Sequence, residues 1–362
     1  SFMPAYIHLT EMAFERLDSV EARRLVAAVN QIDSTSPKAI GLGVAWSLAW
    51  GDSLQRLHAD QLLKSMSGDA LITAKHALNL APDLAQATER VAGATAAQGQ
   101  LSLRHRIQAL DGLALSHELR GHLKQDLAIR ANLTGLMDSA GFIVNWAPLI
   151  PGILRAEGYP VRIEDHPRSP PWPGDQVLWG LWLYGLAASG EGRSEDLKHT
   201  LEALRHFAPV PPKHGDTTFS LVGIERREAA GFVNALVGFE ALRHGDASAA
   251  TLHFSQAADS LRPLTTDVTV VDYQLGKLLL ASGHAAEAER YMLTSQRWRA
   301  GMETELLVPR EYYLGRIAEA RGNPSVAREH YARFVRWWRY ADEPPRPQWE
   351  EARQALSRLA GE

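Results

Sequence analysis

The amino-acid sequence predicts an all-α protein, an α-solenoid of helix hairpins with two proline-rich loop insertions. Three observations predict this fold class. Pairs of glycines recur at a fixed spacing, apolar residues follow a helical period over most of the chain, and strand-like alternation of useful length is missing. The β-branched stretch 265–275 continues in register into the first helix of a repeat, so we expect helix there as well.

The N-terminal part, residues 1–158, is predicted to contain TPR-like helix hairpins, about four of them between residues 4 and 137. The first hairpin turns near Leu17, with Asp18 as the N-cap of the second helix, Glu21 as its capping-box partner and Ala22 at the position of close packing. Three more hairpins follow, with turns at Gly51 and near Gly121 and a helix pair over residues 69–93.

Two stretches interrupt the helical pattern. Residues 159–175 hold five prolines and are predicted to be a linker or a surface loop, and residues 207–223 form a second insertion of the same kind. Their acids and histidines could meet around a divalent cation if the loops folded together, but no ligand spacing requires it, and we predict no metal site. These side chains are Glu164, Asp165, His166, His214 and Asp216.

The C-terminal array, residues 176–362, carries a recurring motif. A glycine is followed by a second glycine seven residues later, by an alanine five residues after that, and by a large apolar residue four residues further on. The copies repeat every 38 to 39 residues. A degenerate fourth copy keeps Gly185 and Gly192 but has Leu197 in place of the alanine. The three clear copies are Gly238, Gly245, Ala250 and Phe254; Gly276, Gly283, Ala288 and Met292; and Gly315, Gly322, Ala327 and Tyr331.

Helix geometry explains this spacing. The first glycine lets the partner helix approach closely because it presents no side chain at the crossing. The second glycine ends the helix in a left-handed conformation, after which Asn323 and Pro324 begin the next helix in the last copy. The alanine faces the same crossing from the second helix, and the large residue fills the core below it. The motif therefore predicts an antiparallel helix hairpin.

The motif resembles the tetratricopeptide repeat, or TPR, which has small residues at its eighth, fifteenth and twentieth positions and an aromatic residue at its twenty-fourth. The resemblance implies a right-handed superhelix with clear copies near 231–262, 269–300 and 308–340 and a degenerate copy near 178–206. The start PAYIHL and the close YYLGRIAEARGN resemble TPR regions of bacterial serine/threonine kinases or transcription regulators. Such a region would be the sensor or docking part of a larger multidomain protein.

In this family the first helices of successive repeats line a concave groove, and a few of their positions contact the ligand. At the corresponding positions this chain has aromatic and apolar residues with two cations, a combination that suits a peptide with an acidic element. The alternative that some of these side chains pack between helices stays open. The predicted ligand-binding residues are Phe239, Tyr273, Lys277, Tyr312 and Arg316.

Composition narrows the function further. The net charge of −4 disfavours binding to nucleic acid, and the most apolar stretch, Phe142 to Ile153, is too short for a membrane span. The stretch HELRGH has its histidines five residues apart, so on one helix His117 and His122 would face different sides. Acid pairs such as Glu350 and Glu351 are typical of helix surfaces. We predict no catalytic residue and no cofactor and, because no secretory signal is recognisable, a cytoplasmic protein.

We therefore expect a non-enzymatic scaffold or sensor module that binds a protein or peptide in the concave groove. One alternative is a helical-toroid enzyme acting on carbohydrate, which would account for the ten tryptophans and the two loops. The other is a small-molecule sensor whose ligand lies in an apolar cavity beneath Trp172.

Overall fold

The computed structural model describes residues 3–79, 81–99, 101–139, 177–207, 222–262, 268–294, 306–342 and 346–360. All regular secondary structure in these ranges is helical, which confirms the predicted all-α class. The contacts divide the chain into two compact units. Unit 1 comprises Ser1–Ala140 and Trp337–Pro344, and unit 2 comprises Gly141–Arg336 and Pro345–Glu362. The predicted boundary at residue 158 and the loop 159–175 lie outside the described residues.

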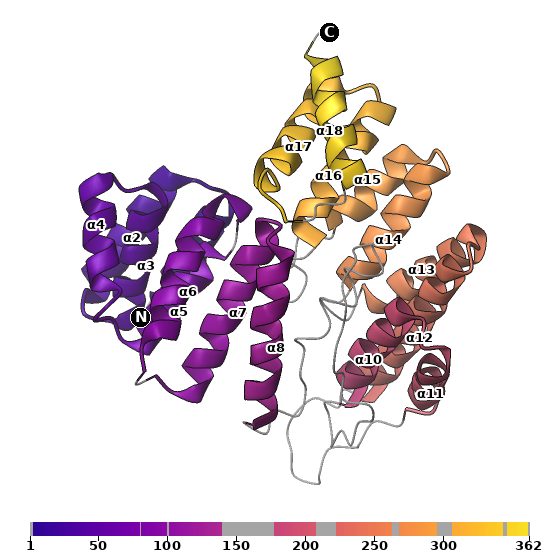
Figure 1. Ribbon diagram of the computed structural model, residues 1–362, viewed down its shortest axis with the longest axis horizontal. Coiled ribbons are helices and arrows are strands. Elements are labelled where there is room, and N and C mark those ends of the chain that lie inside the picture. Colours follow the sequence, from indigo (N-terminus) through magenta and orange to yellow (C-terminus); the bar gives the residue numbers. More distant parts are fainter. Residues whose placement is uncertain are drawn as a thin grey trace. The chain divides into compact units, whose positions relative to one another are not determined.

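Unit 1 is a series of helices in which neighbours along the chain contact one another (Figure 1, indigo to magenta). α3 also packs directly against α5, because Gly41 exposes the α3 backbone to Thr73 of α5, whose Cβ would lie 2.8 Å from an added side-chain carbon. The elements are α1 (Met3–Glu15), α2 (Ser19–Asp33), α3 (Pro37–Trp50), α4 (Ser53–Leu62), α5 (Gly68–Leu78), the 3-10 turn η1 (Pro82–Leu84), α6 (Ala85–Ala97), α7 (Leu103–Leu119) and α8 (Leu123–Ser139).

Local capping explains where these helices begin. Asp18 is the N-cap of α2, as predicted, and its carboxylate accepts a hydrogen bond of 3.0 Å from the Glu21 backbone N–H. The second bond of the predicted capping box, from the Asp18 backbone N–H to the Glu21 carboxylate, does not form. The Glu21 carboxylate instead binds Arg24, at 2.7 Å from its Nε. A complete capping box occurs at the turn into α4, where Asp52 and Gln55 exchange bonds of 2.9 and 2.8 Å.

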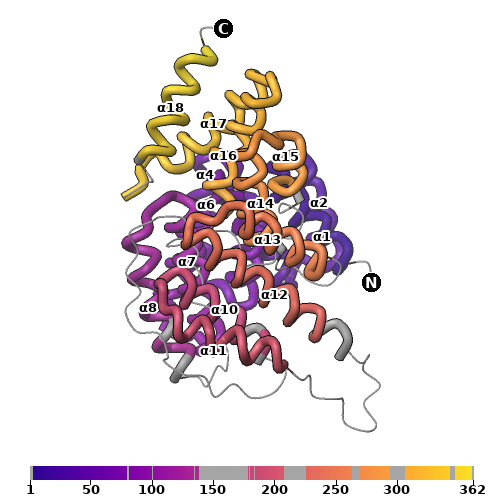
Figure 2. The backbone as a smooth tube through the Cα atoms, turned by 90° about the vertical axis from the view of Figure 1, so that its right-hand side faces the viewer, coloured from indigo at the N-terminus to yellow at the C-terminus, as the bar shows by residue number. Residues whose placement is uncertain are grey.

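Unit 2 consists of hairpins whose first helices contact one another, as α10 does with α12, α14 with α16, and α16 with α18 (Figure 2). α18 thus takes the place that the first helix of a further hairpin would have. The elements are α10 (Val177–Glu191), α11 (Ser194–Arg205), α12 (Val222–Arg243), α13 (Ala247–Leu261), α14 (Val268–Ala281), α15 (Ala285–Thr294), α16 (Leu307–Ala320), α17 (Pro324–Trp337) and α18 (Arg346–Leu359).

The first glycine of each motif lies at a close helix crossing. A Cβ added at Gly315 would come within 2.6 Å of the Tyr331 ring, and one at Gly238 within 2.9 Å of the Phe254 ring. Gly276 has the same relation to Met292, also at 2.9 Å. The large residue of the motif therefore lies directly on the glycine, closer than the predicted position below it. The motif alanines are fully buried beside it: Ala250, Ala288 and Ala327.

The second glycine of each motif has the predicted left-handed backbone. The φ angles are +70° at Gly192, +78° at Gly245, +85° at Gly283 and +72° at Gly322, a region that side chains with a Cβ rarely enter. After Gly322, the Asn323 N–H donates to the Ala318 carbonyl at 2.9 Å and closes the helix end. The next helix, α17, begins one residue later, at Pro324.

Two glycines of α3 provide a matched test of close packing. A Cβ at Gly41 would collide with the backbone carbonyl of Ala70, which cannot move aside, whereas a Cβ at Gly43 meets nothing within 4 Å. We expect Gly41→Ala to lower the free energy of unfolding by about 1–3 kcal/mol through overpacking. We expect Gly43→Ala to raise it by roughly 0.5–1 kcal/mol, because alanine is the better helix former. Urea denaturation followed by circular dichroism measures both, and equal effects would contradict the packing argument.

Candidate functional site

The predicted ligand-binding residues lie on the first helix of three hairpins of unit 2, namely α12, α14 and α16, and most of their aromatic surface is buried. Tyr273 is fully buried, Tyr312 is 2% exposed and Phe239 is 6% exposed. Phe239 packs its ring edge-on against Phe254, with centroids 5.1 Å apart, inside its own hairpin. These three side chains therefore pack between helices, the alternative that the sequence left open. The cations differ, since Arg316 is exposed and Lys277 is half-buried.

Tyrosines from α14 and α16 form a layer beneath the two cations. Tyr313 packs edge-on against both Tyr273 and Tyr312, at centroid distances of 5.6 and 5.0 Å. The Lys277 ammonium lies 5.3 Å from the centroid of the Tyr273 ring and 5.4 Å from that of Tyr313, and the Arg316 guanidinium lies 5.8 Å from that of Tyr312. We call these five residues the tyrosine-cation layer. Tyr313 was missed by the repeat positions, because its role arises from contacts with the neighbouring hairpin.

Helix α18 supplies an acid to this layer. Glu351 accepts a hydrogen bond of 2.6 Å from the Tyr312 hydroxyl, and its other carboxylate oxygen lies 3.8 Å from Arg316 Nε. Gln348, one turn earlier, donates to the Tyr313 hydroxyl at 3.2 Å. Burial raises the pKa of Tyr312, and the bond to Glu351 adds to the effect, so the phenol keeps its proton. Glu351 is thus exposed on a helix surface, as the sequence predicts, and in addition it contacts the tyrosine-cation layer.

A second acid continues the connection between α16 and α18. Glu319 accepts a hydrogen bond of 2.6 Å from the Tyr331 hydroxyl and another of 2.6 Å from Arg358 of α18. Tyr331 of α17 is also the residue that covers Gly315 of α16. Its ring and its hydroxyl therefore both join α17 to α16. α18 adds a short apolar face below these polar contacts, formed by Ala352, Ala355 and Leu359, each at most 8% exposed.

Unit 1 contains a buried ion cluster between α7 and α8. Arg130 donates to Asp126 at 2.7 Å and to Glu118 at 2.8 Å, and all three residues are at most 3% exposed. Burial raises the pKa of Asp126 to about 6 against the opposing effect of Arg130. Shifted acids often mark active sites. Here the three residues are ion-paired to one another. The pairing explains why they are buried, and it links α7 to α8.

The HELRGH stretch is not one continuous helix, so the prediction that His117 and His122 face different sides of a helix was wrong. α7 ends at Leu119, and Gly121 has a φ of +74°, which turns the chain. The His122 N–H donates to the His117 carbonyl at 2.8 Å, and the two rings lie 5.8 Å apart. No group of three or more potential metal ligands occurs among the described residues, these histidines included.

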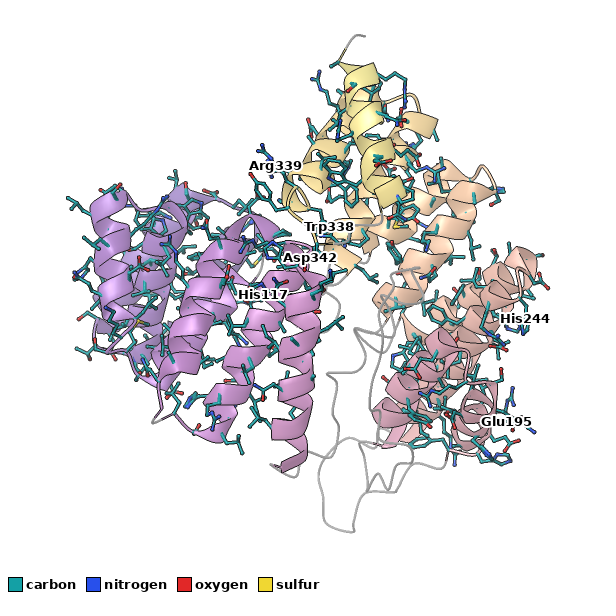
Figure 3. The ribbon with its side chains drawn as sticks, viewed as in Figure 1. His117, Glu195, His244, Trp338, Arg339 and Asp342 are labelled. Carbon is teal, nitrogen blue, oxygen red and sulfur yellow. The ribbon has the colours of Figure 1, made fainter. Side chains whose placement is uncertain are left out.

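The segment after α17 packs against the same turn within unit 1. The Asp342 N–H donates to the Gly121 carbonyl at 3.0 Å, and its carboxylate accepts from the Lys124 backbone N–H at 3.3 Å, at the N-terminus of α8. Figure 3 shows the side chains of His117, Trp338 and Asp342 at this turn. Nothing in the sequence indicates this contact, because it joins segments 218 residues apart.

A cavity of about 540 Å³ lies between α11 and the first half of α12. One wall is apolar and the rim is cationic, and the described part of the lining contains no carboxylate. Its lining residues are Leu204, Arg205, His206, Phe207, Arg226, Ala229, Ala230, Val233 and Asn234.

Two sets of residues considered in the sequence analysis fall in segments that the structure does not describe. The cavity expected beneath Trp172 and the five acids and histidines considered for a cation lie outside the described residues. Among the helices that are described, none is long and apolar enough to cross a membrane.

No protein-family model matches this sequence, and comparison with curated proteins found no significant match. The function is therefore argued from the geometry of the two sites, the tyrosine-cation layer and the α11/α12 cavity.

Asp272, next to the tyrosine-cation layer on α14, allows a test of buried charge. It is 1% exposed, and its carboxylate accepts a hydrogen bond of 2.9 Å from Arg262. Burial raises its pKa from 3.8 to about 6, although Arg262 opposes the shift. The folded state therefore holds this proton more tightly than the unfolded chain does, and the stability from this group falls as the pH rises from about 4 to about 6.

We expect Asp272→Asn to remove this pH dependence. Relative to the parent chain, the variant should gain up to about 3 kcal/mol in free energy of unfolding between about pH 4 and about pH 7, because asparagine has no charge to bury. Urea titrations of both chains at the two pH values measure the difference, and other titrating groups cancel in the comparison. A difference that is the same at both pH values would contradict the shifted pKa.

Proposed function

We propose that this protein is a non-enzymatic docking scaffold, a TPR-like α-solenoid, that binds an acid-bearing helical segment of a partner protein. The docking face is the tyrosine-cation layer of α14 and α16 together with the flank of α18. One observation carries the proposal. Glu351, on an amphipathic helix, already places a carboxylate on Tyr312 and Arg316. The face is therefore shaped and charged to receive the kind of segment that we propose as its ligand.

The contact between Arg316 and Glu351 is weak enough for a partner carboxylate to replace Glu351. The side chains of Arg316 and Glu351 are 44% and 55% exposed, so their ion pair contributes about 0–1 kcal/mol. The Tyr312 bond is stronger because its acceptor is charged. A partner carboxylate that reached Arg316 would compete with one weak contact instead of with a buried network.

The cations decide which partner fits. Because the tyrosine rings are buried, a ligand meets the two positive groups above them, Lys277 and Arg316. A cation held over an aromatic ring is less hydrated than a lysine on the open surface, so it gives up less free energy of hydration when it binds an acid. Its positive charge makes the face select acidic ligands. An amphipathic helix with acids on one face matches this pattern, as α18 does with Glu351.

The alternatives find less support. An enzyme acting on glycosidic bonds needs two carboxylates roughly 5–9 Å apart across a cleft. The lining of the described cavity offers cations and apolar groups instead. The TPR resemblance adds that the chain would serve as the docking part of a larger bacterial regulator, and this belongs to the same proposal.

The test is affinity capture from a lysate of the source organism with matched charge reversals. We expect the parent chain to retain a protein that the Lys277→Glu, Arg316→Glu variant loses, because repulsion replaces attraction at the face. Arg328→Glu, an exposed arginine on α17 away from this layer, should retain it. Circular dichroism confirms that the three chains are equally folded. The retained protein is then mapped to a synthetic helical peptide whose acids are replaced by glutamine or asparagine, which should abolish binding.

Competition with the resident helix gives a second readout in the same assay. Glu351→Gln removes the charged acceptor for Tyr312 and Arg316, so we expect the mapped peptide to bind about tenfold tighter at most and no weaker. Retention of the same protein by the double charge-reversal variant, or weaker binding by Glu351→Gln, would contradict the proposed face.

A further inference from the structure

The cavity between α11 and α12 has the size and the lining of a small-molecule site. Its volume of about 540 Å³ falls within the roughly 300–1,000 Å³ typical of ligand pockets. Leu204 and Ala229, both at most 3% exposed, form part of the apolar wall, and Phe207 and Val233 extend it. Two small residues in succession on α12, Ala229 and Ala230, leave the space open.

Two arginines at this cavity lack carboxylate partners. Elsewhere in the described part of unit 2, arginines within or at the ends of α11, α12, α13, α15, α16, α17 and α18 commonly pair with acids. The paired arginines are Arg193, Arg243, Arg262, Arg290, Arg316, Arg321, Arg333 and Arg358. Among the described residues, Arg205 and Arg226 form no ion pair or hydrogen bond. They come from different helices and line the same cavity.

Two further polar groups face the same space with unused capacity. The His206 ring is held by its Nδ1, which lies 2.8 Å from the Glu202 carbonyl and must donate to it, since a carbonyl oxygen only accepts. This leaves Nε2 available to a ligand. The Asn234 side chain, half-buried in the lining, likewise has no hydrogen-bond partner among the residues that the structure describes.

The dipole of α11 does not account for this arrangement. Cations near a helix C-terminus are ordinary, and Arg205 and His206 stand at the end of α11. Arg226, however, belongs to the first half of α12, so it is not part of the last turn of α11 that carries Arg205. Arg243 at the other end of α12 donates to Ser194 at 3.3 Å, so the two helices run in opposite directions. Figure 3 labels Glu195, in the first turn of α11, and His244, which follows the end of α12.

We propose that this cavity binds a small organic carboxylate with an apolar body. The guanidinium groups of Arg205 and Arg226 hold the carboxylate at the rim, since their planar donors match its two oxygens. The wall of Leu204, Phe207 and Val233 takes the alkyl or aryl body. The site is separate from the docking face, because its lining residues lie on or beside α11 and α12, whereas the docking face is formed by α14, α16 and α18.

Three probes separate the two halves of the proposal: 3-phenylpropionate has both charge and body, 3-phenylpropan-1-ol has the body alone, and acetate has the charge alone. Calorimetric titration of the full chain should show saturable binding of 3-phenylpropionate and at least about tenfold weaker binding of the other two. Equal binding of acetate would overturn the role of the wall, and equal binding of the alcohol would overturn that of the arginines. No saturable binding of 3-phenylpropionate at millimolar concentration would overturn the site.

Variants at exposed positions locate the site without disturbing the fold. Arg226→Gln should weaken 3-phenylpropionate about tenfold or more, whereas Arg227→Gln, the next residue and also exposed but not in the lining, should leave it unchanged. Ala230→Leu fills the cavity at an exposed position and should abolish binding while all charges remain. Equal effects of the two arginine substitutions, or full binding by Ala230→Leu, would place the ligand elsewhere and overturn the proposal.

Discussion

The close crossing of two helices at a glycine is the constraint on which the C-terminal hairpins depend. At Gly238, Gly276 and Gly315 the backbone of the first helix lies in direct contact with a large side chain of the second. No residue with a Cβ fits this gap unless the covering side chain moves. The crossing buries a whole ring or thioether over the glycine and sets the spacing of the pair. It also explains why the motif has a period, because each hairpin solves the same packing problem.

This packing has consequences for recognition. Because the rings of Tyr312 and Tyr331 are held in the hairpin core, their hydroxyl groups alone reach outward, and each hydroxyl donates to a carboxylate. The surface available to a partner is therefore chemically simple, with tyrosine edges beneath Lys277 and Arg316. The chain satisfies part of this surface itself through Glu351 of α18. Specificity at such a face comes from charge more than from the insertion of aromatic anchors.

Charged groups in this protein serve two different purposes. Arg130 with Asp126 and Glu118, and Arg262 with Asp272, are ion pairs with buried acids, and the cost of that burial appears as a raised pKa of the aspartates. Such groups join helices and make the stability depend on pH. Arg205 and Arg226 instead lie exposed at the rim of a cavity, with no acid partner in the described part of the chain. The contrast between paired and unpaired cations is what separates a structural charge from a candidate binding group.

The sequence by itself determined the helical class, the hairpin turns and the left-handed glycines, because caps and turns depend on a few neighbouring residues. It also placed Asp18 and the close crossings correctly. It predicted the turn near Gly121, but it did not determine that the His117 and His122 rings lie close together beside that turn, that Glu351 reaches Tyr312, or that Arg205 and Arg226 share a cavity. Only the tertiary structure decided these points. Exposure and ion pairing depend on which distant segments pack together, and local residue patterns carry no record of that choice.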